Sequence, residues 1–148
     1  MALKAQIQSD MKTALKAGEK DRLSVIRMLL AAIQTREIEN RGDISDAEVL
    51  QVVEKLIKQR KDSAQQFADA GRSDREAQEL SEAEMLQAYL PEQLSEAELN
   101  QLVAEIIDST GAASMKDMGK VMAELRNRAQ GKADMSVLSA LVKGKLAG

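Results

Sequence analysis

Apolar residues recur along this chain at intervals of three and four, which is the period of an amphipathic α-helix. Leu3, Ile7, Met11 and Leu15 form the first such stripe, and Gly18 suits the end of that helix. Six further segments repeat the period, and no stretch alternates as a strand would. The pattern predicts an all-α protein with seven helices, bounded at about residues 2–17, 21–40, 45–71, 73–90, 95–111, 114–131 and 134–146.

Helix starts are marked by a small polar residue that can accept a backbone N–H. Ser45, Ser73 and Ser95 are each followed three residues later by glutamate, which is the pattern of a capping box. Ser114 and Asp134 are also predicted N-caps. Glycine precedes four of these starts by two or three residues, at positions where a preceding helix can end.

Pro91 is the only proline, and it lies between the fourth and fifth predicted helices. Proline lacks an N–H and disfavours helical geometry at the residue before it. We therefore expect a boundary here. The predicted domains are an N-terminal helical domain of about four helices, residues 1–90, and a C-terminal three-helix domain, residues 91–148.

Composition narrows the chemistry. The 148 residues include no cysteine and no histidine, which excludes disulfides and thiolate chemistry and removes the commonest general base and metal ligand. There is no apolar run of about 18 residues and no signal-peptide pattern at the N-terminus. We expect a cytoplasmic protein that does not enter a membrane.

Charge is unevenly distributed. The net charge is −3, yet residues 109–148 carry seven basic and three acidic side chains. A basic tail on an acidic chain is weak support for a polyanion partner. The alternative is that small helices simply carry a solvated basic face, and charge by itself favours that alternative.

The sequence contains no set of residues that is typical of a catalytic site. Ser24 and Ser63 lack the local sequence of an activated nucleophile, and phosphate-binding glycine motifs are absent. We expect no catalytic residue, no cofactor and no metal site. A small enzyme that uses carboxylates or lysine is the least favoured interpretation.

Basic side chains gather in the tail. Lys116 and Lys120 lie near the predicted helix start at Ser114, where unpaired N–H groups and the helix dipole favour a phosphate. Gly119 lies in the same helix at a cost of roughly 1 kcal/mol relative to alanine. Either a neighbouring helix packs tightly there or a ligand backbone approaches closely, and packing is the favoured reading. The candidate nucleic-acid-binding residues are Lys116, Gly119, Lys120, Arg126, Arg128, Lys132 and Lys143, with Lys145 beside the last.

A secondary basic cluster consists of Lys55, Lys58 and Lys61, with Arg60 among them. A solvated face laced with ion pairs is the favoured interpretation of this cluster. The tail has no aromatic side chain on which a base could stack, which argues against a reader of single strands. Recognition of a folded nucleic acid through its backbone stays open.

Four segments resemble the YqeY family, the stand-alone relatives of the tail of GatB, the B subunit of the tRNA-dependent amidotransferase. They are residues 21–29 (DRLSVIRML), 58–63 (KQRKDS), 89–95 (YLPEQLS) and 114–122 (SMKDMGKVM). The resemblance implies an all-α fold with a three-helix C-terminal domain. It also implies a tail surface that helps to hold tRNA, around Lys116, Gly119, Lys120 and the turn at residues 131–134. The catalytic body of GatB has no counterpart here.

The leading hypothesis is a non-catalytic module that binds tRNA, or that accompanies an amidotransferase or another translation-related protein. The alternative is a protein–protein adaptor that docks through an exposed methionine face formed by Met115, Met118 and Met122. Participation in glutamine-dependent carbon–nitrogen ligation follows by family association only. We expect no enzymatic activity from the chain by itself.

Overall fold

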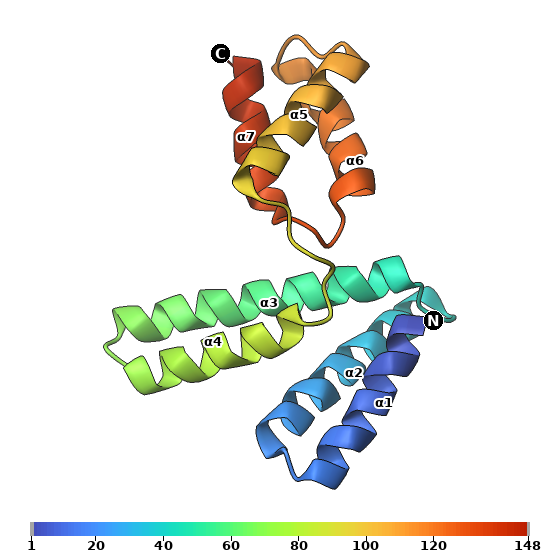
Figure 1. The fold of residues 1–148 in the computed structure, drawn as a ribbon, viewed down its shortest axis with the longest axis vertical. Coiled ribbons are helices and arrows are strands. Elements are labelled where there is room, and N and C mark those ends of the chain that lie inside the picture. Colours follow the sequence, from blue (N-terminus) through green and yellow to red (C-terminus); the bar gives the residue numbers. More distant parts are fainter. Residues whose placement is uncertain (1, 148) are drawn as a thin grey trace. The chain divides into compact units, whose positions relative to one another are not determined.

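The computed structural model describes residues 2–147 (Figure 1). Over this range it contains seven α-helices, one short 3₁₀ helix and no strand, so the predicted all-α class is confirmed. The helices are α1 Ala2–Ala17, α2 Lys20–Asn40, α3 Asp46–Asp69, α4 Ser73–Gln87, α5 Glu96–Thr110, η1 Met115–Asp117, α6 Met118–Ala129 and α7 Met135–Ala147.

Two of the three predicted capping boxes form. The hydroxyls of Ser45 and Ser95 each accept the backbone N–H three residues on, and the glutamate there accepts the serine N–H in return. The predicted box at Ser73 is wrong, because the N-cap is Arg72 and Ser73 is already helical. Gly71 turns the chain with φ 73°, and the Arg72 N–H returns to the Phe67 carbonyl, so the new helix starts one residue early.

The fourth helix also ends earlier than predicted. α4 ends at Gln87. After it, the N–H groups of Tyr89 and Leu90 donate to the carbonyls three residues back, as in a 3₁₀ turn, and not to those four residues back. Pro91 disfavours helical geometry at Leu90, so the last predicted turn unwinds into these single turns.

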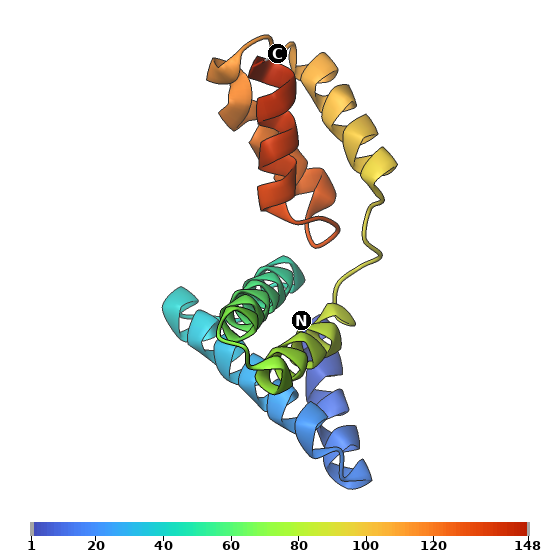
Figure 2. The ribbon, with the colours of Figure 1, turned by 90° about the vertical axis from the view of Figure 1, so that its left-hand side faces the viewer.

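Contacts divide the chain into two compact units, residues 1–90 and 91–148. In the first unit, α3 and α4 form a long antiparallel hairpin and α1 pairs with α2, as Figures 1 and 2 show. Its core is aliphatic, with Ile7, Leu29, Ile33, Val53 and Leu86 fully buried. That each unit is a separately folding domain stays a prediction.

Arg60 ties three helices of the first unit together. Its Nε lies 3.0 Å from Glu82 Oε2 and 3.7 Å from Glu79 Oε2 on α4, and its side chain is only 17% exposed. The guanidinium also donates to the Met28 sulfur on α2. Arg60 therefore serves packing and does not belong to the solvent-facing basic cluster of α3.

Tyr89 fastens the end of α4 to α1, because its hydroxyl donates to Asp10 Oδ2 at 2.7 Å. Burial and then the Asp10 carboxylate raise the pKa of Tyr89 well above its ordinary value of about 10, and Arg22 opposes this in part. The folded chain thus holds the phenolic proton more tightly than the unfolded chain. The resulting stability is complete below pH of about 10 and is lost as the pH rises further.

This is measurable because Tyr89 is the only tyrosine and the chain has no tryptophan. We expect an ultraviolet absorbance titration of the native protein to show phenolate appearing only well above the ordinary tyrosine pKa. Asp10→Asn should lower that midpoint. A native midpoint close to that of free tyrosine would contradict the contact.

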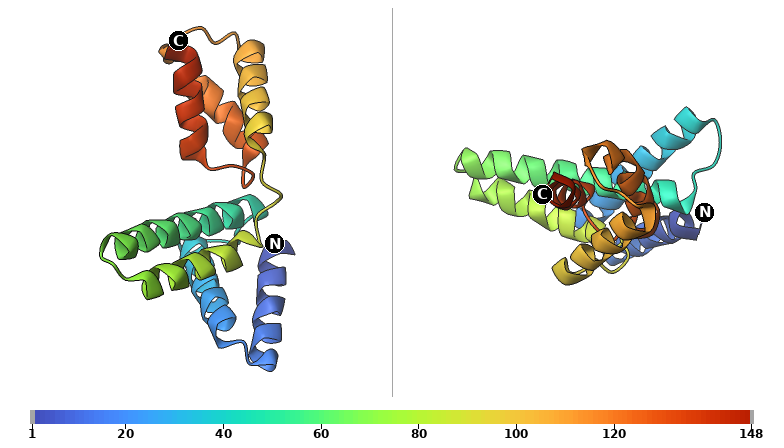
Figure 3. Two further views of the ribbon diagram at one scale, coloured as in Figure 1. Left: turned by 60° about the vertical axis from the view of Figure 1, so that its left-hand side comes forward. Right: turned by 90° about the horizontal axis from the view of Figure 1, so that it is seen from above.

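The second unit is a three-helix arrangement of α5, α6 and α7 (Figure 3). Val103, Ile106, Leu125 and Leu138 are fully buried between the helices. The segment before α5 joins the turn after α6: the Leu94 N–H donates to the Lys132 carbonyl at 2.9 Å, and the Gln93 side-chain amide donates to the Gly131 carbonyl at 2.6 Å. These bonds fix the turn that carries Lys132.

Candidate functional site

Ser114 is an N-cap with Asp117 at the third position, as predicted, but the element that it caps is a 3₁₀ turn and not the α-helix itself. Residues 115–117 form the 3₁₀ turn η1, and the α-helix begins only at Met118. Lys116 therefore lies in the turn and Lys120 lies in the first turn of α6. The two lysines are exposed and four residues apart.

Asp117 closes the loop before this turn. Its Oδ2 accepts the N–H of Ala113 at 2.9 Å and the N–H of Ser114 at 3.3 Å. These backbone bonds, with a smaller contribution from the Lys120 charge, hold the pKa of Asp117 below its ordinary value. A carboxylate thus lies close to the place where a phosphate was predicted, so this helix start is a weaker anion site than the sequence indicated.

The exposed face of α6 is positively charged. Gly119, Ala123, Arg126 and Asn127 are all exposed, and their spacing of four, three and one residues places them on one side of the helix beside Lys120. Sequence reasoning missed Ala123 and Asn127, although the intervals of four and eight from Gly119 were a usable signal.

No helix packs against Gly119. A Cβ added there would meet no heavy atom within 4 Å outside its own helix. The favoured explanation of this glycine, tight packing, is therefore wrong. Gly119 is the second residue of α6, so the cost of a glycine in a helix interior does not apply to it in full.

Arg128 lies on a different flank of α6. Its Nε is 3.1 Å from Glu124 Oε1, one helical turn back, so its charge is partly neutralised. Both side chains are solvent-accessible, and such a pair contributes little to stability. Arg128 is therefore a weaker candidate than Arg126.

The remaining candidates separate toward two ends of the second unit. The twelve residues of α6 span about 18 Å. Lys132 lies in the turn after α6, at the opposite end of this helix from Lys116. α7 then runs back along α6 and contacts η1, so Lys143, near the end of α7, lies toward the end of the unit that carries Lys116. Figure 1 shows η1 and the end of α7 at this same end of the unit.

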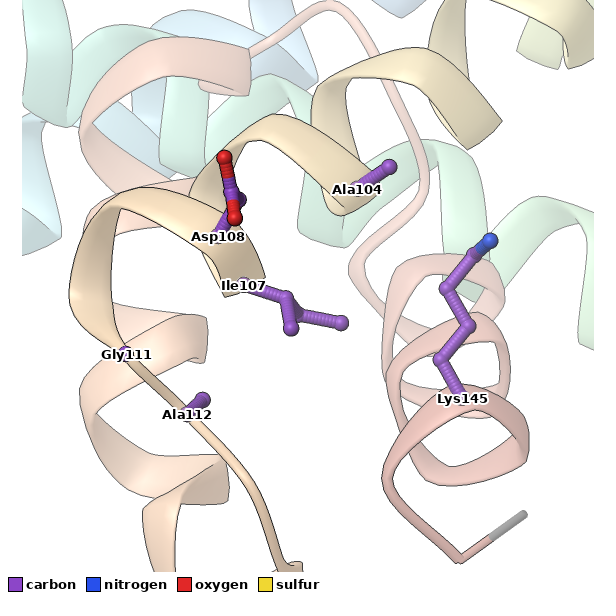
Figure 4. Close-up of a pocket in the computed structure, with 6 residues that line it drawn as sticks. All are labelled: Ala104, Ile107, Asp108, Gly111, Ala112 and Lys145. Carbon is purple, nitrogen blue, oxygen red and sulfur yellow. The ribbon is translucent and has the colours of Figure 1, made fainter.

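Lys145 faces away from this surface. It lines a pocket of about 400 Å³ between α5 and α7, to which Ile107 and Asp108 of α5 also contribute (Figure 4). Ala104, Gly111 and Ala112 complete the lining. The pocket holds one carboxylate and one ammonium group over small apolar residues, so it offers no net attraction to a polyanion.

The second unit as a whole is not basic. Residues 91–108 carry five acidic side chains and no basic one, so α5 is an acidic helix and residues 91–148 have a net charge of −1. Counting charge from residue 109 hid this, because the count began after α5. The basic surface is confined to α6, α7 and the turns that flank them.

The secondary basic cluster is also smaller than predicted. Lys55, Lys58 and Lys61 are exposed on α3, whereas Arg60 is withdrawn toward α4. Lys55 lines a groove of about 440 Å³ between α2 and α3 together with Arg36. Arg36 is itself engaged, with its Nε 3.2 Å from Glu48 Oε2.

The methionine face proposed for a protein adaptor does not form. Met115 is 44% exposed, but Met118 is half-buried against the core and Met122 is only 9% exposed. Two of the three side chains therefore belong to the interior of the unit. This removes the feature on which the adaptor alternative was based.

Across residues 2–147, no three acidic side chains converge as a metal site would require. In the same range, no helix combines the length and apolarity needed to cross a bilayer. Ser24 is exposed on α2 and Ser63 is half-buried on α3. These positions add no nucleophile–base pair to what the sequence offered.

Comparison with known proteins finds one family whose model covers nearly the whole chain. The family model described as Yqey-like protein matches residues 4–146. "Altered inheritance of mitochondria protein 41, mitochondrial" of Lachancea thermotolerans is 35% identical over 123 residues, which cover 78% of this chain and 66% of that protein. The protein of the same name in Saccharomyces cerevisiae is 34% identical, over 70% of this chain and 57% of that protein.

"Uncharacterized protein C22F3.15" of Schizosaccharomyces pombe is 32% identical over 93 residues, which cover 63% of this chain and 76% of that protein. The chain thus spans less than two thirds of the length of the two mitochondrial relatives.

The expected cytoplasmic location is wrong by this comparison, because the first relatives are named as mitochondrial proteins. The expectation rested on missing cysteines and on missing membrane and secretory signals. Those features argue against an oxidising or membrane environment, and they do not distinguish one aqueous compartment inside the cell from another.

Proposed function

The chain belongs to the YqeY family, and we propose that it binds tRNA through the exposed face of α6. One observation carries the proposal. Gly119 leaves open space at the N-terminal end of a face that also presents Lys120 and Arg126, with Lys116 in the turn just before it. Without a Cβ at this position, the backbone of a ligand can come close to the start of α6.

The chemistry of this face favours phosphate and sugar over base edges. Lys116, Lys120 and Arg126 can neutralise phosphates, and Asn127 can both donate to and accept from a ribose hydroxyl. Gly119 and Ala123, which share this face, carry no side-chain donor for reading a base. With no aromatic residue after Tyr89, stacking cannot provide the affinity.

The acidic helix α5 restricts the side of the unit from which a polyanion can bind. A polyanion is attracted to α6 and repelled by the five carboxylates of residues 91–108. We therefore propose a one-sided contact in which RNA lies along α6 and does not wrap around the unit.

We further propose that the protein acts as an accessory module and not as an enzyme by itself. Its support is the absence of histidine and cysteine from the sequence and the resemblance of its C-terminal helices to the tail of GatB. A role in glutamine-dependent carbon–nitrogen ligation would then require a partner that carries the catalytic groups, and amidotransferase is the partner that this resemblance favours.

Titration of the purified protein with bulk tRNA tests the proposal, with double-stranded DNA as the control. If three to four phosphates are contacted, the logarithm of the binding constant should fall with the logarithm of salt with a slope of roughly −3. Affinity for tRNA should then drop roughly 60-fold for a fourfold increase in salt. Absence of tRNA binding at low salt, or equal binding of DNA, would contradict the proposal.

A further inference from the structure

Asp117 stands between the two lysines of the proposed site and contacts the backbone on their N-terminal side. Its carboxylate accepts two N–H groups, from Ala113 and Ser114, and its own N–H donates to the Ser114 carbonyl at 3.0 Å. These three bonds close the loop that leads from α5 into η1. They define the position from which Lys116 projects.

We propose that Asp117 is the positioning residue of the anion site and also limits its affinity. The inference rests on the proposed function, since it assumes that a polyanion binds at Lys116 and Lys120. Asp117 orders the turn that presents Lys116, and the same carboxylate repels the phosphates that the two lysines attract.

The two effects act through different atoms. Ordering requires an oxygen that accepts the two N–H groups, and an asparagine amide provides such an oxygen as well as a carboxylate does. Repulsion requires the negative charge. At about 8 Å in water, one charge changes phosphate affinity roughly two- to threefold.

Other residues of the same unit make the test specific. Glu105 is an exposed carboxylate of α5 that accepts from the side-chain amide of Gln101 at 3.2 Å, one turn away on the same helix. Glu105→Gln changes the net charge as Asp117→Asn does, but on the acidic helix. It separates a local effect at the lysines from a general change in charge.

The experiment compares Asp117→Asn, Asp117→Ala and Glu105→Gln in the full chain, by titration with bulk tRNA. We expect Asp117→Asn to bind two- to threefold more tightly than the wild type. Asp117→Ala has the same charge as Asp117→Asn but no acceptor, and should bind at least fivefold more weakly than that variant. Glu105→Gln should bind within twofold of the wild type.

Hydrogen exchange gives a second readout that does not depend on RNA. The amides of Ala113 and Ser114 should exchange faster in Asp117→Ala and should stay protected in Asp117→Asn. Unchanged exchange in the alanine variant would overturn the positioning role. If the wild type binds tRNA while the asparagine and alanine variants bind it equally, this inference fails by itself; if the wild type binds no tRNA, the proposed function fails and takes the inference with it.

Discussion

Changing Lys116, Lys120 and Arg126 together to glutamine is expected to weaken tRNA binding about 100-fold at roughly 0.15 M salt. Each basic side chain that neutralises a phosphate releases a counterion, and each lost contact lowers the binding constant by roughly 0.7 logarithmic units at that salt. The slope of affinity against salt should become shallower by roughly 2 to 3. Fluorescence anisotropy of labelled tRNA at several salt concentrations measures both quantities.

The matched control is the triple change of Lys55, Lys58 and Lys61 to glutamine. It removes the same charge from exposed positions of α3, in the other unit of the chain. If binding follows only the net charge of the protein, the two triple variants will lose affinity equally, and the assignment of the site to α6 is wrong. We expect the control to retain affinity within a few-fold of the wild type.

Changing Arg60 to methionine is expected to lower the free energy of unfolding of the first unit by about 2–3 kcal/mol. Methionine retains most of the volume but leaves Glu79 and Glu82 facing each other without a counter-charge. The side chains of Arg60, Glu79 and Glu82 are between 17% and 25% exposed to solvent. The expected loss of free energy is therefore smaller than for a fully buried ion pair. Urea unfolding followed by the fluorescence of Tyr89 reports this unit selectively, because no other tyrosine or tryptophan is present.

The control for this variant removes the uncompensated charge. Adding Glu79→Gln and Glu82→Gln to the methionine variant should restore at least half of the lost free energy, because the remaining groups are neutral. If Arg60→Met unfolds at the same urea concentration as the wild type, Arg60 is a surface residue and the contacts to α4 contribute nothing measurable. Binding of tRNA should be unaffected by either variant.

Residues that look alike in sequence take different roles in the folded chain. Arg60 and Lys61 are neighbours in one basic segment, yet Arg60 pairs with α4 and Lys61 is exposed. Ser45 and Ser73 begin the same four-residue motif, yet only Ser45 caps a helix. In both cases the outcome depends on how α3 and α4 pack as a hairpin, which a local pattern does not contain.

The same holds for the candidate site. The sequence identified Gly119 as costly in a helix but could not decide whether a neighbour or open solvent faces it. Lys143 and Lys145 differ by two positions, and helix geometry turns them to different sides, one of them toward α5.

The sequence by itself determined the all-α class, the number of helices and most of their ends. The reason is that apolar spacing, serine caps and glycine stops act through contacts within a few residues. Only the tertiary structure decided that Arg60 serves packing and that Gly119 lies open. These properties depend on which side chains distant in sequence share a surface, and that is fixed by helix packing and not by local periodicity.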